Sequence, residues 1–189
     1  MITRAAKVLL LAGVGFYYAL VVFNNLTDFD SNYQFVRHVL SMDSTFPGNH
    51  GMGRALNSSR IHLVVYLAII AGEIVTAILL WWAVVRLLGA MREPAGAFNG
   101  AKGVAIAALT LAMAMWLVAF LAVGGEWFLM WQSRTWNGQE AAFGMFAVDG
   151  LVLLILMQPD GEGQPRALRS VRLSLRLAPA AVLDSPSSC

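Results

Sequence analysis

Four long apolar stretches constrain this chain more than any other feature of its sequence. They cover residues 5–23, 62–88, 104–123 and 141–157. A helix needs about 20 mainly apolar residues to cross about 30 Å of hydrocarbon, because it rises by about 1.5 Å per residue. We therefore predict an all-α fold in which four transmembrane helices form a bundle.

The charge content also indicates a membrane protein. Only 13% of the 189 residues are charged, 58% are hydrophobic, and the mean hydropathy is +0.65. A soluble domain carries about 25% charged residues, so this chain lacks the charge that a water-exposed surface needs. A net charge of +2 without a focused basic patch argues against a nucleic-acid partner.

The first stretch has the position of a signal peptide, but it is long and no small-residue cleavage site follows, so we expect a retained helix.

The distribution of Lys and Arg predicts the topology. Nine of these residues lie at the N-terminus, between the second and third stretches, or in the C-terminal tail, against four in the other two loops. Because positively charged segments stay on the cytoplasmic side, both termini are predicted to be cytoplasmic. In a bacterial inner membrane the loops after the first and third stretches then face the periplasm. We assign residues 1–158 to the membrane domain and 159–189 to a basic tail.

The first outer loop, residues 24–61, is much longer than the roughly 2–8 residues that join most bundle helices. Ser31 and Gln34 have the spacing of a capping box, and Tyr33, Val36 and Leu40 then follow on one helical face. We predict a short amphipathic helix over residues 32–42, at the membrane surface or over the mouth of the bundle. A turn at residues 46–49 is expected to end it.

The second outer segment, residues 124–139, is rich in aromatic side chains. Rings at the end of a spanning helix favour the headgroup layer and are typical of an interfacial belt. Alternatively, they dock against the first outer loop or a partner subunit, because aromatic residues and Arg dominate binding hot spots. The candidate interface residues of the two segments are Tyr33, Phe35, Arg37, Glu126, Trp127, Phe128, Trp131, Arg134 and Trp136.

Two acidic residues interrupt the apolar stretches, Glu73 in the second and Asp149 in the fourth. A carboxylate near the bilayer centre is costly, so such residues usually face the bundle interior and mark a function. No Lys or Arg lies near the centre of a stretch to neutralise these acids. Each acid can therefore be protonated, bind a cation, or accept hydrogen bonds from a cofactor or partner. Facing acids can share one proton. Alternatively, each is a neutral acid hydrogen-bonded within the bundle as polar glue between helices. Candidate partners are Thr76, Thr110, Tyr17 and Tyr18.

Cofactor and metal sites are weakly indicated. His38 and His62 are the candidate haem ligands, but a haem in a bundle usually takes its ligands from facing helices. A metal site built from these two with Asp43 and His50 has no recognised ligand spacing. The single Cys189 excludes an intramolecular disulfide and a thiolate cluster. We assign no catalytic residue, no metal site and no cofactor.

Two segments resemble the signature segments of a bacterial family of predicted small integral membrane proteins, catalogued as a domain of unknown function. They are FNNLTDFDSNYQFVRHVLSMDSTFPGN at 23–49 and GGEWFLMWQSRTWNGQEAAF at 124–143. The resemblance covers residues 7–156 and implies a four-span inner-membrane protein without an assigned catalytic residue. The tail from residue 159 is unlike the family. Its arginines, among them Arg169, Arg172 and Arg176, suit either a basic amphipathic segment on anionic lipid or a disordered tail.

These observations favour a non-catalytic accessory or assembly subunit of a larger inner-membrane complex, of the respiratory or photosynthetic type. Its partners would be the lipid bilayer and other membrane subunits, because Gly13, Gly15, Gly72 and Ala77 allow close contact between helices. One alternative is a haem- or quinone-binding membrane anchor of a redox enzyme. Another is a small ion or proton pathway through Glu73 and Asp149.

Overall fold

The computed structural model describes residues 1–161, and within them every regular element is a helix. Four helices are long and apolar enough to cross a membrane, which confirms the predicted all-α bundle. The helices are α1 (Ile2–Thr27), α2 (Phe29–Ser41), η1 (His50–Arg54), α3 (Ser59–Gly89), α4 (Ala95–Ala101), α5 (Gly103–Ala114), η2 (Met115–Trp127), η3 (Met130–Gln132) and α6 (Gln139–Met157). The basic segment expected around Arg169, Arg172 and Arg176 lies outside the described residues.

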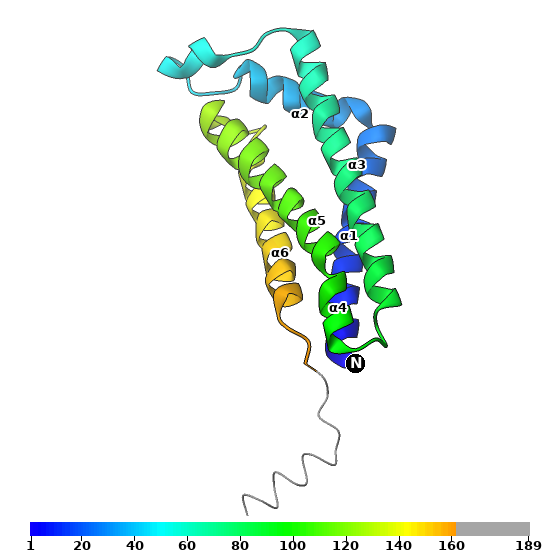
Figure 1. Cartoon of the computed structure of the whole chain (residues 1–189). Coiled ribbons are helices and arrows are strands. Elements are labelled where there is room, and N and C mark those ends of the chain that lie inside the picture. Colours follow the sequence, from blue (N-terminus) through cyan, green and yellow to red (C-terminus); the bar gives the residue numbers. More distant parts are fainter. Residues whose placement is uncertain (162–189) are drawn as a thin grey trace, which may run out of the picture.

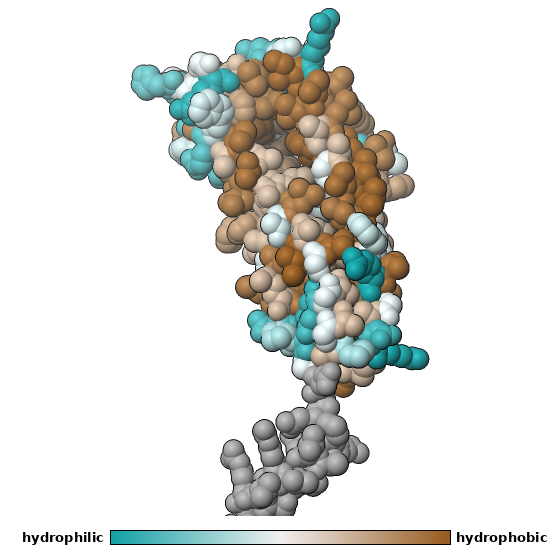
Figure 2. Space-filling view, in the orientation of Figure 1, coloured by the Kyte–Doolittle hydropathy of each residue, from teal (hydrophilic) through white to brown (hydrophobic). Residues whose placement is uncertain are grey.

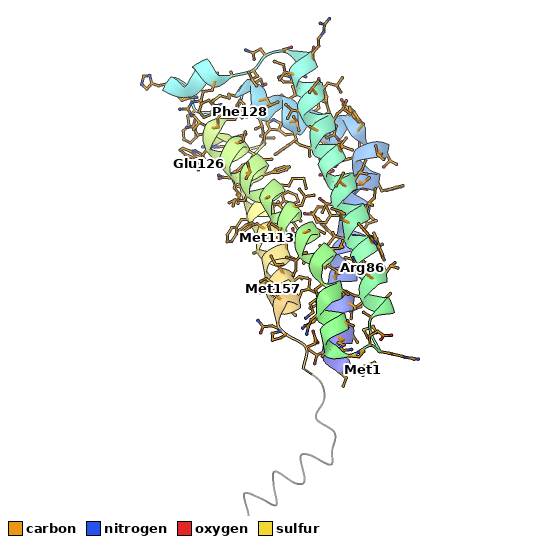
Figure 3. The ribbon with its side chains drawn as sticks, in the orientation of Figure 1. Met1, Arg86, Met113, Glu126, Phe128 and Met157 are labelled. Carbon is orange, nitrogen blue, oxygen red and sulfur yellow. The ribbon has the colours of Figure 1, made fainter. Side chains whose placement is uncertain are left out.

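The bundle has two distinct ends (Figure 1). Met1, α4 and the segment after α6 lie at one end, which we call the base. The helix α2 lies across the opposite end, which we call the loop end. Figure 3 shows Glu126 and Phe128 at the loop end, far from Met1.

The helices pack closely in the half of the bundle next to the base. Small side chains recur along the third span at helical spacing and are buried, so the helix backbones can approach. They are Ala101, Ala105, Ala108 and Ala112. They belong to the base core, an apolar cluster that also includes Leu11 and Val14 of α1 and Leu80, Ala83 and Leu87 of α3.

The helices separate toward the loop end. Beyond Ala112 the third span carries larger side chains, including Met115, Trp116 and Phe120, and there α3 and η2 diverge (Figure 1). A second apolar cluster, the loop-end core, closes this half. It consists of Val36, Val39, Leu40, Met42, Tyr66, Ile70, Phe128 and Met130. The separation leaves space between the two cores.

The segment η2 is a π-helix over Met115–Trp127. In a π-helix the characteristic hydrogen bond joins an N–H to the carbonyl five residues earlier. The pattern extends to its C-terminal boundary, where the Phe128 N–H donates to the Val123 carbonyl at 3.0 Å. π-Helical turns are rare and occur frequently at functional sites. The apolar sequence gives no local signal for this wider winding.

The third span begins at Ala95, earlier than the predicted residue 104. The prediction counted Lys102 in the loop before the span, and a charge inside a span is costly. The structure buries Lys102, which is only 3% exposed, and neutralises it with Asp160. The helix can therefore continue through this residue to Pro94, which precedes its first turn.

The helix α2 spans Phe29–Ser41 and begins before the predicted residue 32. The predicted capping box is wrong. The Ser31 hydroxyl donates to the Asp28 carboxylate, and the Gln34 amide donates to Asp30. The helix ends at Met42, which adopts a left-handed conformation, before the predicted turn at residues 46–49. The position of α2 relative to the lipid surface stays a prediction.

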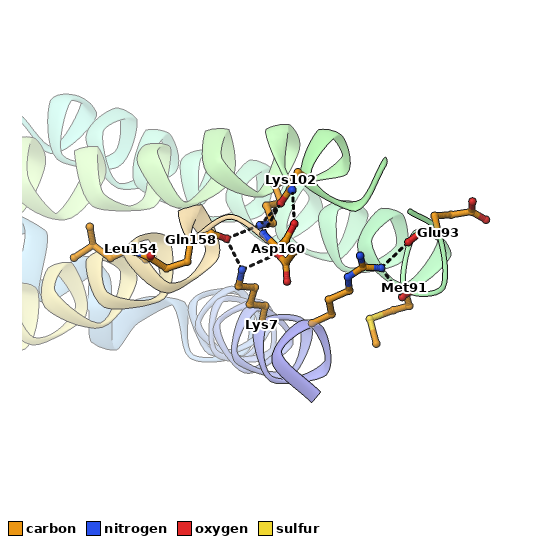
Figure 4. A network of polar contacts seen from close by, with 9 residues as sticks. Lys7, Met91, Glu93, Lys102, Leu154, Gln158 and Asp160 are labelled. Atoms are coloured by element: carbon orange, nitrogen blue, oxygen red, sulfur yellow. Dashed lines mark hydrogen bonds and ion pairs between the residues drawn. The ribbon is translucent and has the colours of Figure 1, made fainter. Parts of the chain in front are cut away.

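Buried ion pairs tie the base together (Figure 4). The Lys7 ammonium lies 2.7 Å from Asp160 Oδ2, and Lys102 forms a second ion pair with the same oxygen. Both ammonium groups also donate to the Gln158 carbonyl, and the Asp160 N–H donates to Asn99 Oδ1. One carboxylate therefore joins α1, the third span and the segment that leaves α6.

The two ammonium groups control the protonation of Asp160. Burial acts to raise the pKa of this carboxyl, but hydrogen bonds and charge attraction from Lys102 and Lys7 outweigh burial, so its pKa lies below the usual value. A carboxyl with a lowered pKa stabilises the folded state at pH values above the pKa of the unfolded chain. That contribution is lost as the pH falls through the lowered value.

We predict that Asp160→Asn lowers the free energy of unfolding in mixed detergent micelles by about 3 kcal/mol at pH 7, because two buried ammonium groups lose their counter-ion. The difference between the variant and the wild type should begin to shrink below about pH 4, where Asp160 becomes protonated in the unfolded chain. It should disappear once the pH falls through the lowered pKa of the folded carboxyl. Glu93→Gln is the matched control, since its side chain is exposed at the same end. Equal losses in the two variants would contradict the role of the ion pairs.

Candidate functional site

The two intramembrane acids predicted from the sequence lie inside the bundle, each with its own partners. Glu73 on α3 is 3% exposed. Its Oε2 accepts a hydrogen bond from the Asn25 amide of α1 at 2.6 Å. Asn25 Oδ1 in turn accepts one from the Tyr66 hydroxyl at 3.1 Å. No hydrogen bond reaches Glu73 Oε1 from the described residues.

Asp149 on α6 is completely buried. Its Oδ2 accepts a hydrogen bond from the Tyr18 hydroxyl of α1 at 3.1 Å. The same hydroxyl oxygen accepts one from the indole Nε1 of Trp116 on η2 at 2.7 Å. Asp149 Oδ1 has no partner within residues 1–161. This relay joins α1, η2 and α6.

The candidate partners of the acids fare differently. The Tyr18 hydroxyl donates to Asp149, as expected if this acid is hydrogen-bonded within the bundle. The Thr76 hydroxyl instead donates to the Gly72 carbonyl, and Thr110 is exposed. Tyr17 lies within electrostatic reach of both carboxyl groups. Within residues 1–161, no hydrogen bond joins the two acids.

Sequence reasoning missed Asn25 because it placed this residue in the outer loop. The helix α1 continues to Thr27, beyond the predicted end at residue 23, and carries Asn25 into the bundle, where it is 4% exposed. A polar residue pair directly after an apolar stretch was the available signal. Whether such a pair enters the bundle depends on the helix that faces it.

A cavity of about 300 Å³ lies beside Glu73, between the base core and α2. Its walls come from α1, α2, α3, η2, and the start of α6. We call it the polar lobe. It is lined by Tyr17, Val21, Asn24, Asn25, Asn32, Phe35, Val36, Tyr66, Ile69, Glu73, Trp116, Phe120, Gly138 and Ala141.

A second cavity of about 270 Å³, the apolar lobe, adjoins the first. The two share Phe35, Val36, Ile69 and Phe120 in their walls. The other residues that line the apolar lobe are aliphatic, aromatic, Met or Gly residues. They belong to α2, α3, η2 and the segment that follows η2. Figure 2 shows a recess in the apolar surface in this region, below the outer segments. The two lobes together offer one polar and one apolar compartment.

The two outer segments contact each other at the loop end. The Ser44 hydroxyl donates to the Ser133 hydroxyl at 2.8 Å, and the Phe46 N–H donates to Gln132 Oε1 at 3.0 Å. Arg54 donates to the Trp127 carbonyl and lies over the Trp127 ring. These contacts close the bundle above the polar lobe.

The predicted interface residues divide into inward-facing and outward-facing groups. The first group packs within the chain: Tyr33 lies beside Phe29 and Tyr66, Phe35 beside Trp136, and Phe128 in the loop-end core. The second group is exposed and consists of Arg37, Glu126, Trp127, Trp131 and Arg134. Of these, Trp127 and Trp131 leave 56% and 44% of their surface exposed. Arg37 bonds only to its helical neighbour Gln34 among the described residues.

The histidines do not meet at one site. His38 Nδ1 lies 2.8 Å from the Asp43 carboxylate, and the ring stacks on Trp136 at 4.5 Å between centroids. His62 is buried, and its Nε2 lies 2.6 Å from the Leu56 carbonyl. Neither histidine lines the polar or the apolar lobe. Within residues 1–161, no three His, Cys, Asp or Glu side chains lie close enough together to hold a metal ion.

We predict that Tyr18→Phe lowers the free energy of unfolding by about 1–3 kcal/mol, because both Trp116 Nε1 and Asp149 Oδ2 lose a buried partner. Its neighbour provides the control. Tyr17→Phe removes a hydroxyl that makes no hydrogen bond to the described residues and should change the same quantity by about 0.5 kcal/mol or less. Unfolding in mixed micelles measures both, and a larger loss for Tyr17→Phe would refute the relay.

Comparison with known proteins gives one match. The model of a family described as "Predicted small integral membrane protein (DUF2165)" matches residues 3–159, which include both acids and both outer segments. No curated protein and no solved structure matches the chain.

Proposed function

Because the chain belongs to this family of predicted small integral membrane proteins, whose description names no activity, we propose that it is a non-catalytic protein that binds one small amphiphilic molecule from the bilayer. The observation that carries this proposal is the pair of adjoining lobes, which share four wall residues. A hydrogen-bonding head fits the polar lobe beside Glu73, and an apolar chain fits the apolar lobe.

The size and position of the lobes support a binding site. Sites for small molecules are concave, largely apolar spaces of about 300–1,000 Å³ with a few polar groups, and in bundles they lie between helices. The recess in the apolar surface gives such a molecule a route from the lipid (Figure 2). A quinone is one molecule of this build. Haem finds less support, since neither histidine lines the lobes.

The residues that line the lobes support binding rather than catalysis. None of them is Ser, Cys, His, Lys or Arg, and the titratable side chains are Glu73, Tyr17 and Tyr66. Nucleophilic catalysis needs a nucleophile with an adjacent base. A proton pathway through Glu73 and Asp149 finds less support, because the two acids belong to separate hydrogen-bond networks.

We predict that the protein extracted from native membranes in a mild detergent retains about one amphiphile per chain by native mass spectrometry. Ile69→Trp fills the wall shared by both lobes and should abolish this retained mass. Ile78→Trp on the same helix is the matched control, because Ile78 is 62% exposed and faces away from the bundle. Equal retention in the two variants would show that the lobes are not the site.

A second candidate function is that of an accessory or assembly subunit in a larger complex of the bacterial inner membrane. It is favoured by the exposed aromatic residues at the loop end. Phe46, Trp127 and Trp131 keep 44–56% of their surface exposed although the outer segments are fixed to each other. Rigidly held aromatic side chains are typical of binding hot spots. The excess of Lys and Arg toward the base and tail would place that end in the cytoplasm.

For this candidate we predict that the chain migrates as part of a larger assembly on native gels after mild extraction. Replacing Trp127 and Trp131 together with Ala should release it as a smaller species. Replacing Trp81 and Trp82 of α3 together with Ala is the control, since these rings are similarly exposed but lie away from the loop end. Migration of the unaltered chain as a lone protein would exclude the accessory role.

A further inference from the structure

The charged residues in the wall of the polar lobe indicate the kind of molecule that it holds. Among residues 1–161, Glu73 is the one acidic residue in its wall, and no Lys or Arg accompanies it. In the part of the chain that the structure describes, Glu73 forms no ion pair. A carboxyl inside a membrane bundle usually pairs with a cation or a set of donors. The protein supplies one donor, the Asn25 amide, to one of the two carboxyl oxygens.

The other carboxyl oxygen, Oε1, is available to a ligand. Glu73 is 97% buried by its neighbours, lines the cavity, and receives no hydrogen bond at Oε1 from the described residues. Two of the donors in the lobe are already engaged, since Asn25 donates to Glu73 and the Tyr66 hydroxyl donates to Asn25. Oε1 is therefore an acceptor in the cavity wall that a ligand carrying a donor or a positive charge can satisfy.

Aromatic residues line the same cavity as Glu73. Tyr17, Phe35, Tyr66, Trp116 and Phe120 all line the polar lobe, and the rings of Trp116 and Phe120 lie 4.8 Å apart between centroids. The negative face of an aromatic ring attracts a cation, and the attraction grows when the cation is removed from water. Cages of aromatic residues are the usual recognition site for ammonium groups. A cavity whose wall holds one carboxyl group and five aromatic residues is thus suited to a cationic head.

We propose that the adjoining lobes bind a lipophilic cation, an amine or quaternary ammonium ion with an apolar chain. The ammonium group lies at Glu73 among the aromatic rings, and the chain lies in the apolar lobe. This inference rests on the proposed amphiphile site and adds the charge of the ligand. An anionic head is disfavoured because it would meet Glu73 without a positive residue in the wall.

The test compares two probes of the same shape in lipid nanodiscs made from neutral phospholipid. One is the octyltrimethylammonium ion, and the other is its neutral analogue with carbon in place of nitrogen. Calorimetric titration, corrected with protein-free nanodiscs, gives the affinity of the full chain for each probe. We expect the cation to bind at least about tenfold more tightly than the neutral analogue.

Variants then assign this preference. Glu73→Gln keeps the shape of the side chain and should abolish the preference while leaving binding of the neutral probe. Asp149→Asn is the matched control, because this buried acid does not line either lobe, and it should keep the preference. If Glu73→Gln does not fold, two other measurements decide the question. They are the ratio of the affinities of the wild type for the two probes, and the loss of the preference for the cation in Ile69→Trp.

The outcomes separate the two proposals. Equal affinity for both probes, or a preference that survives Glu73→Gln, overturns the cationic ligand and leaves the amphiphile site standing. Binding of neither probe above the protein-free nanodiscs, together with no retained molecule from native membranes, overturns both. Tighter binding of the cation that disappears in Glu73→Gln supports both.

Discussion

A carboxyl group inside a lipid-facing bundle has to find its hydrogen-bond donors within the protein, because hydrocarbon supplies none. Glu73 and Asp149 impose this constraint on all four spans. Asn25 and Tyr66 gather around the first acid, and Tyr18 and Trp116 around the second. The two hydrogen-bond networks therefore join the spans to one another, and the polar lobe lies beside the first of them.

The two halves of the bundle differ because they are packed with side chains of different size. Near the base, small alanine side chains let the helices touch, and Asp160 neutralises two buried lysines. Toward the loop end, large aromatic side chains and a π-helix hold α3 and η2 apart, and α2 with the outer segments covers the space between them. A closed base beneath an open polar lobe suits a protein that holds a molecule rather than one that conducts ions through its length.

The four spanning helices and the two intramembrane acids could be predicted from the sequence, but only some of the residues of the site could. The apolar stretches gave the four spans, and the cost of a charge in lipid singled out Glu73 and Asp149. The third span was predicted to begin at residue 104, which is too late, because the counter-ion that lets the helix include Lys102 lies 58 positions along the chain, at Asp160. Asn25 was placed in a loop, the capping box at Ser31 was wrong, and the π-helix was missed, since neighbouring residues alone do not specify these features.

The sequence by itself determined that this is a four-helix membrane protein with two acids within its spans. Those properties follow from hydrophobic length and from the local cost of burying charge, and both can be read residue by residue. Only the tertiary structure decided which groups satisfy each acid, that Glu73 keeps one oxygen free beside a cavity, and that Lys7 and Lys102 share one carboxylate. These depend on how helices distant in sequence approach or diverge, which is set by the summed packing of many side chains.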